Sequence, residues 1–392
     1  MQEEITLILT ISFIIIFSPF LARVTKLLTT PVEIILGAIL GYLGYLHHSE
    51  LFTLIAEVGF LYLMFLAGTE INLKKILNIK ADTLKNVIGY IFFLYVLSAA
   101  FTIFLDLGKI LMVILPLISV GLVVTLSKEY GKTPWLELGM MAGAVGEVVS
   151  ITVLSFSAAA LQFGFGYELI QAGFVLGFFI FFIFLLFKFL QILFWWYPEV
   201  STVLMPHSDN QEQDIRLSMG IFFILIAMML YLKLELAFGA FIAGMFIPTF
   251  FEHKEELPEK LASYGFGFLI PIFFIHVGTL FDIKALSMDG LIEKAILITV
   301  IMILIRLLSS VVFIKELGFR DAMLVALSHS MPLTLLIAVA TLAHHAQSID
   351  DLHYYAFVLA ALFEVIVVMS AIKLIQNSTT EKDLDTITTT KT

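Results

Sequence analysis

Residues 37–43 read GAILGYL and residues 239–246 read GAFIAGMF, two short, apolar and Gly-rich strings. The segments that follow them also correspond. GTEINLKKIL (68–77) and GTLFDIKAL (278–286) share Gly-Thr, an apolar residue, Asn or Asp, another apolar residue and Lys. Two matches in the same order indicate an internal duplication, so we expect a fold built from two related halves.

Composition places both halves in a membrane. Of the 392 residues, 60% are hydrophobic, 14% are charged and 38 are Phe, and the mean hydropathy is +1.03. A water-soluble core cannot use that much apolar surface. The net charge of −10, without a basic stripe, excludes a nucleic-acid-binding protein, and the absence of Cys excludes a disulfide scaffold.

Charges, Pro and Gly divide the apolar runs into segments of membrane-spanning length. They predict an all-α polytopic membrane protein with about 13 transmembrane helices. The predicted spans cover about 5–22, 31–46, 51–69, 84–105, 110–127, 136–162, 167–194, 215–232, 234–250, 261–281, 291–313, 320–344 and 352–376. The first has no basic start and no small-residue cleavage site, so we expect a retained span and not a signal peptide.

Orientation follows from the positions of Lys and Arg. Most of the 22 cationic residues fall on one side when the amino terminus is placed outside, and cytoplasmic loops are the side that accumulates them. This predicts a multi-pass protein of the cell (inner) membrane with a cytoplasmic carboxyl terminus. Seven spans separate the third segment from its counterpart, and an odd displacement reverses direction, so the repeats are expected to be inverted.

The domain prediction is one transmembrane unit over residues 1–376. Its inverted repeats cover about 31–162 and 234–376 and are linked by spans within 167–232, and residues 377–392 form a short polar cytoplasmic tail. Transporters built in this way place the ion or substrate site near the midplane, where discontinuous helices meet.

Residues that interrupt a helix occur at matching positions in the two halves of the sequence. Span five carries Pro116, Ser119 and Gly121, and span twelve carries His329, Ser330 and Pro332. Both spans are predicted to be broken helices, whose freed backbone groups could bind a cation. The alternative is that Pro and Gly only kink these spans.

Ionisable residues inside the predicted spans are candidates for a functional or ion-pairing role, because a charge at the bilayer centre is costly. Glu147 lies about halfway along span six beside small residues and is the leading candidate for the carboxylate that binds a proton or cation; otherwise it would serve only as a partner for Arg306. Arg306, in span eleven, keeps its proton and is expected to offset negative charge. Glu364, in the last span, is expected to pair with Arg306, with a second transport site or a lipid-interface position as alternatives. His329 is expected to be a buried, hydrogen-bonded histidine.

Four stretches resemble a known family in their order and spacing. They are PVEIILGAILGYLG (31–44), IAEVGFLYLMFLAGTEINL (55–73), LELAFGAFIAGMF (234–246) and IPIFFIHVGTLFDIKAL (270–286). Together they look like the monovalent cation:proton antiporter family, in its Kef-type and bacterial sodium/proton exchanger branch. The resemblance implies a thirteen-helix exchanger with a dimerisation domain and a mobile core domain holding two crossed broken helices. Such proteins are usually homodimers that move by an elevator-like mechanism.

The resemblance also assigns residues. Ser119 is similar to the serine of the family's first broken helix, whereas Ile118 stands where Thr is typical. In AGAVGEVV (142–149), Gly146 takes the first and Glu147 the second of two positions usually held by two acids or by Asn and Asp. Arg306 matches an intramembrane Lys or Arg. The stretch SHSMP (328–332) stands where an Arg-Gly-Glu-like run is frequent, and Glu364 has no counterpart in the resemblance.

These assignments imply a secondary active antiporter that exchanges Na⁺ or K⁺ for H⁺. We expect electroneutral 1:1 exchange, because Glu147 can hold one proton or one cation. The expected partners are the cation, the proton, membrane lipid and a second copy of the chain, without a cofactor, a resident metal or nucleic acid. A solute symporter of related fold, a cation channel and a transport-inactive ion or pH sensor are the open alternatives. An enzyme is not expected, since the sequence gathers no nucleophile, base and orienting group.

Overall fold

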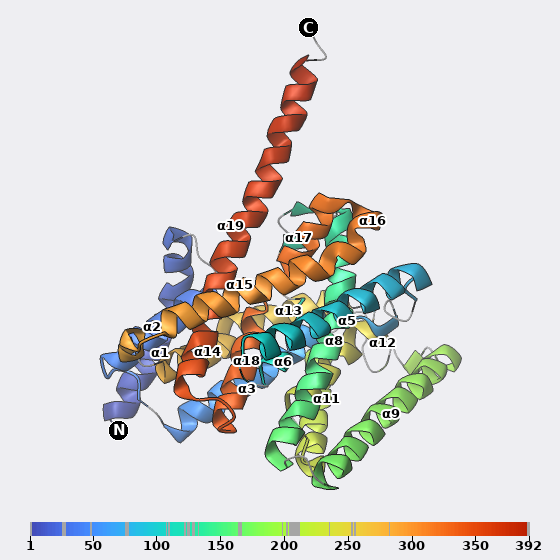
Figure 1. Cartoon of the computed structure of the whole chain (residues 1–392). Coiled ribbons are helices and arrows are strands. Elements are labelled where there is room, and N and C mark those ends of the chain that lie inside the picture. Colours follow the sequence, from blue (N-terminus) through green and yellow to red (C-terminus); the bar gives the residue numbers. More distant parts are fainter. Residues whose placement is uncertain are drawn as a thin grey trace. The chain divides into compact units, whose positions relative to one another are not determined.

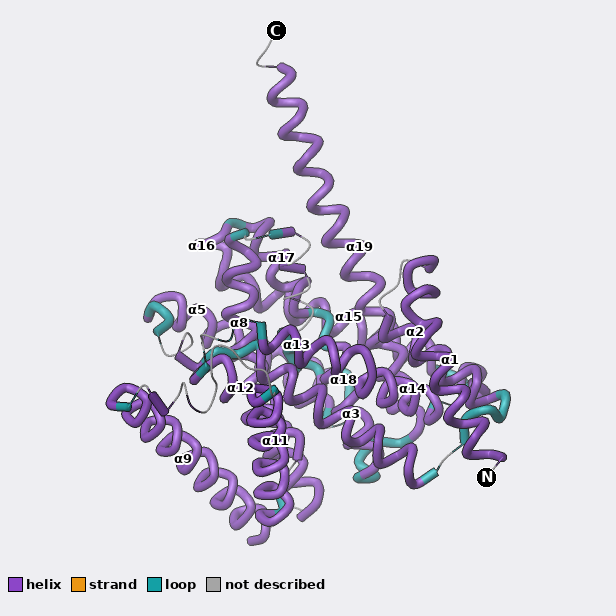
Figure 2. The backbone as a smooth tube through the Cα atoms, turned by 180° about the vertical axis from the view of Figure 1, so that it is seen from behind, coloured by secondary structure: helices purple, strands orange, loops and turns teal. Residues whose placement is uncertain are grey.

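In the residues that it describes, the computed structural model consists of helices joined by loops, without a strand (Figure 2). These residues are 2–25, 29–47, 49–74, 78–106, 108, 110–120, 123, 126–127, 130–131, 133–163, 167–197, 199–200, 203, 212–234, 236–251, 254, 256–281 and 283–389. The expected all-α class is therefore confirmed.

Nine helical stretches within the described ranges are long and apolar enough to cross a bilayer (Figure 1). They belong to α1 (Gln2–Thr25), α3 (Glu50–Thr69), α5 (Ala81–Phe104), α8 (Pro134–Phe163), α9 (Tyr167–Trp196), α11 (Gln213–Leu232), α13 (Leu257–Tyr264) continuing through η1 (Gly265–Leu269) into α14 (Ile270–Leu280), α15 (Leu291–Ser309) and α19 (Asp351–Thr389). The chain is thus a multi-pass membrane protein.

Shorter elements lie between these spans. They are α2 (Thr29–Tyr42), α6 (Leu111–Ile114), α12 (Leu236–Phe250), η2 (Ile283–Ser287), α17 (Phe319–His329) and α18 (Leu333–His345). The span that begins with α15 continues through η3 (Ser310–Phe313) and α16 (Ile314–Leu317). The helices follow the order of the predicted spans, although α2 and α12 are shorter than the lengths that we expected. The count of thirteen stays a prediction, because the fifth predicted span, 110–127, is described only in part.

The chain divides into two compact units. The first contains residues 1–79, 151–287 and 341–348, and the second contains residues 80–150, 288–340 and 349–392. Each unit is therefore assembled from segments that lie far apart in the sequence.

Glycines allow two pairs of helices in the first unit to touch through their backbones. Where α3 packs on α12, a Cβ on Gly68 would lie 2.0 Å from the carbonyl oxygen of Phe241, and a Cβ on Gly244 would lie 1.9 Å from that of Phe65. Real Cβ contacts are never that short, and a backbone carbonyl cannot rotate away as a side chain can. Only glycine permits this crossing.

The crossing of α2 and α14 repeats the same geometry. A Cβ on Gly37 would lie 2.4 Å from the carbonyl oxygen of Ile275, and one on Gly278 would lie 2.2 Å from that of Ile34. In both crossings each glycine lies over the carbonyl three residues before the other glycine. These four glycines come from the strings that correspond between the two halves of the sequence.

The surface of the first unit carries large apolar side chains, as expected of a helix bundle in lipid. On α9, Phe174 and Phe178 are exposed, whereas Phe179 is buried and packs against Phe238 of α12. Exposed Phe next to buried Phe on one helix indicates that the helix contacts lipid on one side and protein on the other.

The second unit contains α5, α6, the first half of α8, α15, α17 and α19. Here α15 packs extensively on α19 and also on α5 and α17. Two breaks interrupt its helices. Residues 117–119, after α6, and 331–332, between α17 and α18, have no regular structure, so both predicted breaks are present in the described residues.

Candidate functional site

A buried carboxylate on α8 is the centre of the candidate site. Glu147 is 1% exposed and lies near the middle of α8. Its Oε1 accepts a hydrogen bond from Ser119 Oγ at 3.2 Å, and its Oε2 accepts one from the backbone N–H of Val120 at 3.0 Å. The structure therefore brings together the two residues, Glu147 and Ser119, that the sequence assigned to ion binding.

The donors to Glu147 belong to the first helix break. After α6, the helical run ends at Pro116, because proline has no backbone N–H to continue the helical hydrogen bonds. The freed backbone groups find partners on other helices. The N–H of Ile118 donates to Ser150 Oγ at 3.1 Å, and the carbonyl oxygen of Leu117 accepts from Arg306 Nη2 at 2.5 Å. Side chains of α8 and α15 thus form the hydrogen bonds that these backbone groups need and that lipid could not provide.

Gly146 and Ile118 fit together beside the carboxylate. A Cβ on Gly146 would lie 2.5 Å from Ile118 Cδ1 and 3.2 Å from its Cβ, and Ile118 is itself buried. The branched Ile118 side chain occupies the space that a side chain at 146 would need. Position 146 therefore offers no second acid, and the wall facing it is apolar.

Arg306 is fully buried, and its bonds go to backbone carbonyls. Nη1 donates to the carbonyl of Met302 at 2.6 Å, one turn earlier on α15, and Nη2 donates to Leu117. The expected ion pair between Arg306 and Glu364 is not formed among the described side chains, because both oxygens of Glu364 lack a hydrogen-bond partner. The guanidinium group instead donates a hydrogen bond to the carbonyl of Leu117, which the helix break leaves without a helical partner.

His329 ends α17 at the second break and is fully buried. Its Nε2 lies 2.8 Å from the carbonyl oxygen of Gly139 on α8, and its Nδ1 lies 3.2 Å from Tyr90 Oη on α5. A carbonyl only accepts, so Nε2 carries the proton and Tyr90 donates to Nδ1 in the neutral ring. His329 is therefore the hydrogen-bonded buried histidine that we expected.

The remaining residues predicted for the site make no hydrogen bond to Glu147 among the described residues. The hydroxyl of Ser330 donates to the carbonyl of Ala326 at 2.8 Å, within its own helix. Gly121 lies outside the described residues. Glu364 is buried on α19 without a hydrogen bond to the described residues around Glu147.

Sequence reasoning missed three partners at the site. Ser150 lies three residues after Glu147 on the same helix, so helical spacing could have identified it. The carbonyl of Leu117 and the N–H of Val120 are backbone groups, and no residue type signals which of them a distant side chain will reach.

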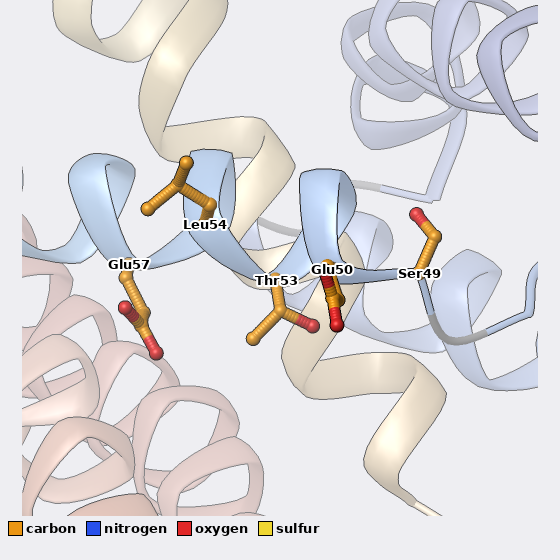
Figure 3. A pocket seen from close by; sticks show the side chains of 5 residues that line it. All are labelled: Ser49, Glu50, Thr53, Leu54 and Glu57. Atoms are coloured by element: carbon orange, nitrogen blue, oxygen red, sulfur yellow. The ribbon is translucent and has the colours of Figure 1, made fainter.

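Two polar clusters of the first unit belong to other elements. A pocket of about 470 Å³ is lined by Ser49, Glu50, Thr53, Leu54 and Glu57, all at the start of α3 (Figure 3). Glu50, Thr53 and Glu57 point from the same side of the helix, and Thr53 Oγ1 lies 3.4 Å from His276 Nε2 on α14. The pocket contains none of the residues that the sequence assigned to ion binding.

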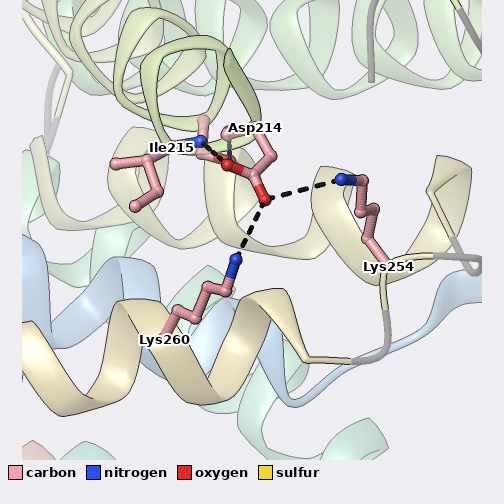
Figure 4. Close-up of polar contacts among 5 residues, drawn as sticks. Asp214, Ile215, Lys254 and Lys260 are labelled. Carbon is pink, nitrogen blue, oxygen red and sulfur yellow. Dashed lines mark hydrogen bonds and ion pairs between the residues drawn. The ribbon is translucent and has the colours of Figure 1, made fainter. Parts of the chain in front are cut away.

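The second cluster joins α11 to the α12–α13 region. Oδ2 of Asp214, which is 2% exposed, lies 3.7 Å from Lys254 Nζ and 3.8 Å from Lys260 Nζ, while Oδ1 accepts from the N–H of Ile215 (Figure 4). Lys260 is about half exposed, so this is a carboxylate held at an edge of the bundle by two lysines. Among the described residues, no group of three or more His, Asp or Glu side chains could hold a metal ion.

Comparison with known proteins adds independent findings. Residues 8–376 match the family described as "Sodium/hydrogen exchanger, transmembrane". The Bacillus subtilis protein named "Putative Na(+)/H(+) antiporter YjbQ" is 27% identical over 358 residues, which cover 84% of this chain. The match covers 56% of YjbQ, so the chain spans little more than half of that relative's length.

Two further proteins extend the comparison. GerN of Bacillus cereus, named as a Na⁺/H⁺-K⁺ antiporter, is 25% identical over 290 residues, which are 70% of each chain. The solved structure of the sodium proton antiporter MjNhaP1 from Methanocaldococcus jannaschii is similar with a TM-score of 0.68 and 15% identity. It covers 95% of this chain and 99% of the other, so the two share a fold over nearly their whole length.

Proposed function

The chain belongs to the sodium/hydrogen exchanger family, and from that premise we propose that it exchanges a monovalent cation for a proton at Glu147. The single observation that carries the proposal is the buried carboxylate of Glu147 beside a helix break. Isolation of a carboxylate's charge from water is costly, and a bound cation or proton would offset the charge of Glu147.

The first shell for a cation would come from Glu147 and Ser119. Carboxylate and hydroxyl oxygens are suitable ligands for a hard monovalent cation, and the Ser119 hydroxyl, which now donates to Oε1, can turn a lone pair outward when the cation arrives. The N–H of Val120 holds the other carboxylate oxygen in either state. The broken segment would thus hold the carboxylate while its ligand changes.

We infer electroneutral 1:1 exchange from the charges around the site. Gly146 supplies no second acid, and Ile118 fills the space in which one would stand. Arg306 keeps its proton, so its charge is the same in the cation-loaded and proton-loaded states. One carboxylate then carries either one cation or one proton, and the cycle moves no net charge.

Na⁺ and K⁺ are both proposed as cargo. The names of the relatives support Na⁺ in each case and K⁺ for GerN. Alternating access of Glu147 from the two sides of the membrane would couple the cation gradient to the proton gradient, as in other secondary transporters.

The larger organisation is part of the same proposal. The reciprocal glycine crossings, Gly37 with Gly278 and Gly68 with Gly244, support an inverted repeat in one exchanger unit over residues 1–376. A homodimer in the inner membrane, with the amino terminus outside and the carboxyl terminus cytoplasmic, completes the arrangement that the family resemblance and the Lys and Arg distribution favour.

A flux assay in everted membrane vesicles tests this function. A pH gradient is formed, and its collapse is followed with a quenched dye on addition of Na⁺, K⁺ or Li⁺. We expect collapse with the wild type and loss of collapse with Glu147→Gln. Glu137→Gln is the matched control, because Glu137 lies on the same helix but is exposed. Collapse in Glu147→Gln vesicles at the wild-type rate would remove Glu147 from the mechanism.

Charge balance is tested in the same vesicles. A membrane potential of either sign, set with a potassium gradient and valinomycin when Na⁺ is the cargo, should leave the final extent of exchange unchanged. Net exchange driven by the potential alone would contradict the 1:1 stoichiometry.

A further inference from the structure

Three polar atoms remain unsatisfied between two packed helices of the second unit. Glu364 on α19 is 0% exposed, and neither of its carboxyl oxygens has a hydrogen-bond partner among the described residues. Arg306 on α15 is also 0% exposed, and its Nε–H has no acceptor among the residues that the structure describes. One donor and two acceptors are thus buried without partners in the described part of the chain, and native proteins rarely keep buried polar atoms in that condition.

The two residues belong to one helix–helix contact. The helices α15 and α19 pack together, and Thr299 Oγ1 of α15 lies 3.4 Å from the carbonyl oxygen of Ala360, one turn before Glu364. Among the described side chains, no hydrogen bond joins Arg306 to Glu364.

Other charged groups on the packed helices are engaged elsewhere. At the start of α15, Lys294 Nζ lies 3.0 Å from His353 Nε2, two turns or more from Glu364. On α17, Arg320 bonds to Gln376 and lies near Asp321, while His329 is held by Tyr90 and Gly139. The described side chains of these helices therefore leave Arg306 as the buried cation on the helix packed against that of Glu364.

Burial decides which form Glu364 takes. Isolating the charge of an ionised carboxylate without hydrogen bonds in a dry interior is costly, whereas burying the neutral acid costs much less. The arrangement observed, with both oxygens unpartnered and Arg306 bound to Leu117, is compatible with the neutral acid. We propose that Glu364 is a second proton-binding residue, which holds a proton in this arrangement and forms an ion pair with Arg306 Nε when the proton leaves.

This proton would be coupled to the exchange site through Arg306. The guanidinium group bonds to Leu117, two residues before Ser119, and its positive charge lies in the same unit as Glu147. A neutral Glu364 leaves that charge uncompensated, which opposes a cation at Glu147. An ionised Glu364 neutralises it, so loss of the proton should raise the affinity for the transported cation.

Infrared spectroscopy of the purified full-length protein tests for the proton directly. A protonated carboxylic acid has a C=O stretching band distinct from that of a carboxylate. We expect an acid band in the wild type near neutral pH that is missing from Glu364→Gln and displaced in Glu364→Asp, which keeps the acid if the Gln variant does not fold. Glu293→Gln, at an exposed position of α15, is the control and should keep the band. Identical acid bands in the wild type and both Glu364 variants would overturn the proposal.

Transport gives the second readout and rests on the proposed function at Glu147. At alkaline pH the apparent KM for the cation should rise about tenfold in Glu364→Gln, the size of a unit-charge interaction over roughly 10 Å at an effective dielectric constant of about 20. The slope of log KM against pH should also become shallower, because one of two titrating groups is gone. An unchanged KM and slope would contradict the coupling.

The two claims fail separately. If the wild type shows the Glu364 acid band but exchanges no cation, the exchange proposal is wrong and the proton site stands. If exchange depends on Glu147 but the band never depends on Glu364, the second proton site is wrong and the exchange proposal stands.

Discussion

Gly146 and Ile118 are complementary in shape, since a Cβ on Gly146 would lie 2.5 Å from Ile118 Cδ1. Because the Ile118 side chain fills the space beside Gly146, these two residues decide which side chains can stand next to Glu147. A larger residue at 146 requires a smaller residue at 118, so a change at one position should be compensated by a change at the other.

The Gly146→Asn variant should destabilise the protein by about 1–3 kcal/mol through overpacking. Ile118→Thr alone should also destabilise it, because it removes a methyl group from a packed wall and buries a hydroxyl. The double variant should be more stable than the sum of the two effects, with a coupling of about 0.5–3 kcal/mol. Thermal unfolding in detergent measures all four proteins. Effects that add to within about 0.5 kcal/mol would show that the two positions do not share one space.

The glycine crossings predict a second effect on stability. Gly244→Ala and Gly68→Ala should each lower the unfolding temperature, because a Cβ within about 2 Å of a backbone carbonyl forces α3 and α12 apart. The matched control is Gly220→Ala on α11, where a Cβ would meet nothing within 4 Å. That control should leave the unfolding temperature unchanged or slightly higher, since Ala favours helix. Equal effects at all three positions would argue against the close crossing.

Arg306 gives a third prediction. Arg306→Met removes the donor to the carbonyl of Leu117 and leaves that buried carbonyl unpaired, which should cost about 1–3 kcal/mol. Arg320→Met on α17 is the control, because Arg320 is partly exposed and its bond to Gln376 lies at the surface, where substitutions typically change stability by less than about 0.5 kcal/mol. The comparison uses thermal unfolding, with exchange activity as a second readout. A smaller loss for Arg306→Met than for Arg320→Met would contradict the role given to the guanidinium group.

The prediction of the site from sequence succeeded where a residue type was itself unusual. Glu147 stands out as a mid-span acid next to glycines, and Ser119 lies beside the Pro116 break, so both could be assigned without coordinates. The helix order could be predicted for the same reason, because lipid requires long apolar runs separated by polar turns. The bounds of α2 and α12 were harder to predict, since apolar residues continue beyond the helix ends.

The partner of Arg306 could not be predicted because it is a backbone carbonyl. Sequence reasoning pairs charges with charges, and Glu364 was the visible opposite charge. In the structure the helix break exposes the carbonyl of Leu117, and a buried guanidinium group bonds to it instead. The fit of Ile118 against Gly146 was equally hidden, because it depends on which faces of two distant segments meet.

A pH-dependent prediction concerns the loop before α19. Burial alone would raise the pKa of Asp350, but hydrogen bonds from the backbone and ring of His353 and the charge of Lys294 act in the opposite direction, and its pKa lies below the ordinary value. The folded state therefore favours the carboxylate. Its stabilising contribution is present above the ordinary pKa of Asp and is lost as the pH falls through the lowered value.

Asp350→Asn should accordingly lower the unfolding temperature at pH 7 by a small amount and by less as the pH is lowered towards about 3. A difference between wild type and Asp350→Asn that grows on acidification would reverse the sign and contradict the assignment.

Proton release on cation binding tests the central claim most directly. Na⁺ or K⁺ is added to the purified protein in weakly buffered detergent, near the pH at which the vesicles show exchange, and released protons are counted against bound cation. In a Glu364→Gln background, where Glu147 alone is left to exchange a proton for the cation, we predict about one proton released per cation bound, with or without Glu137→Gln, and neither binding nor release when Glu147→Gln is added. Cation binding without proton release, or release that persists in Glu147→Gln, would show that the two ions do not compete for this carboxylate.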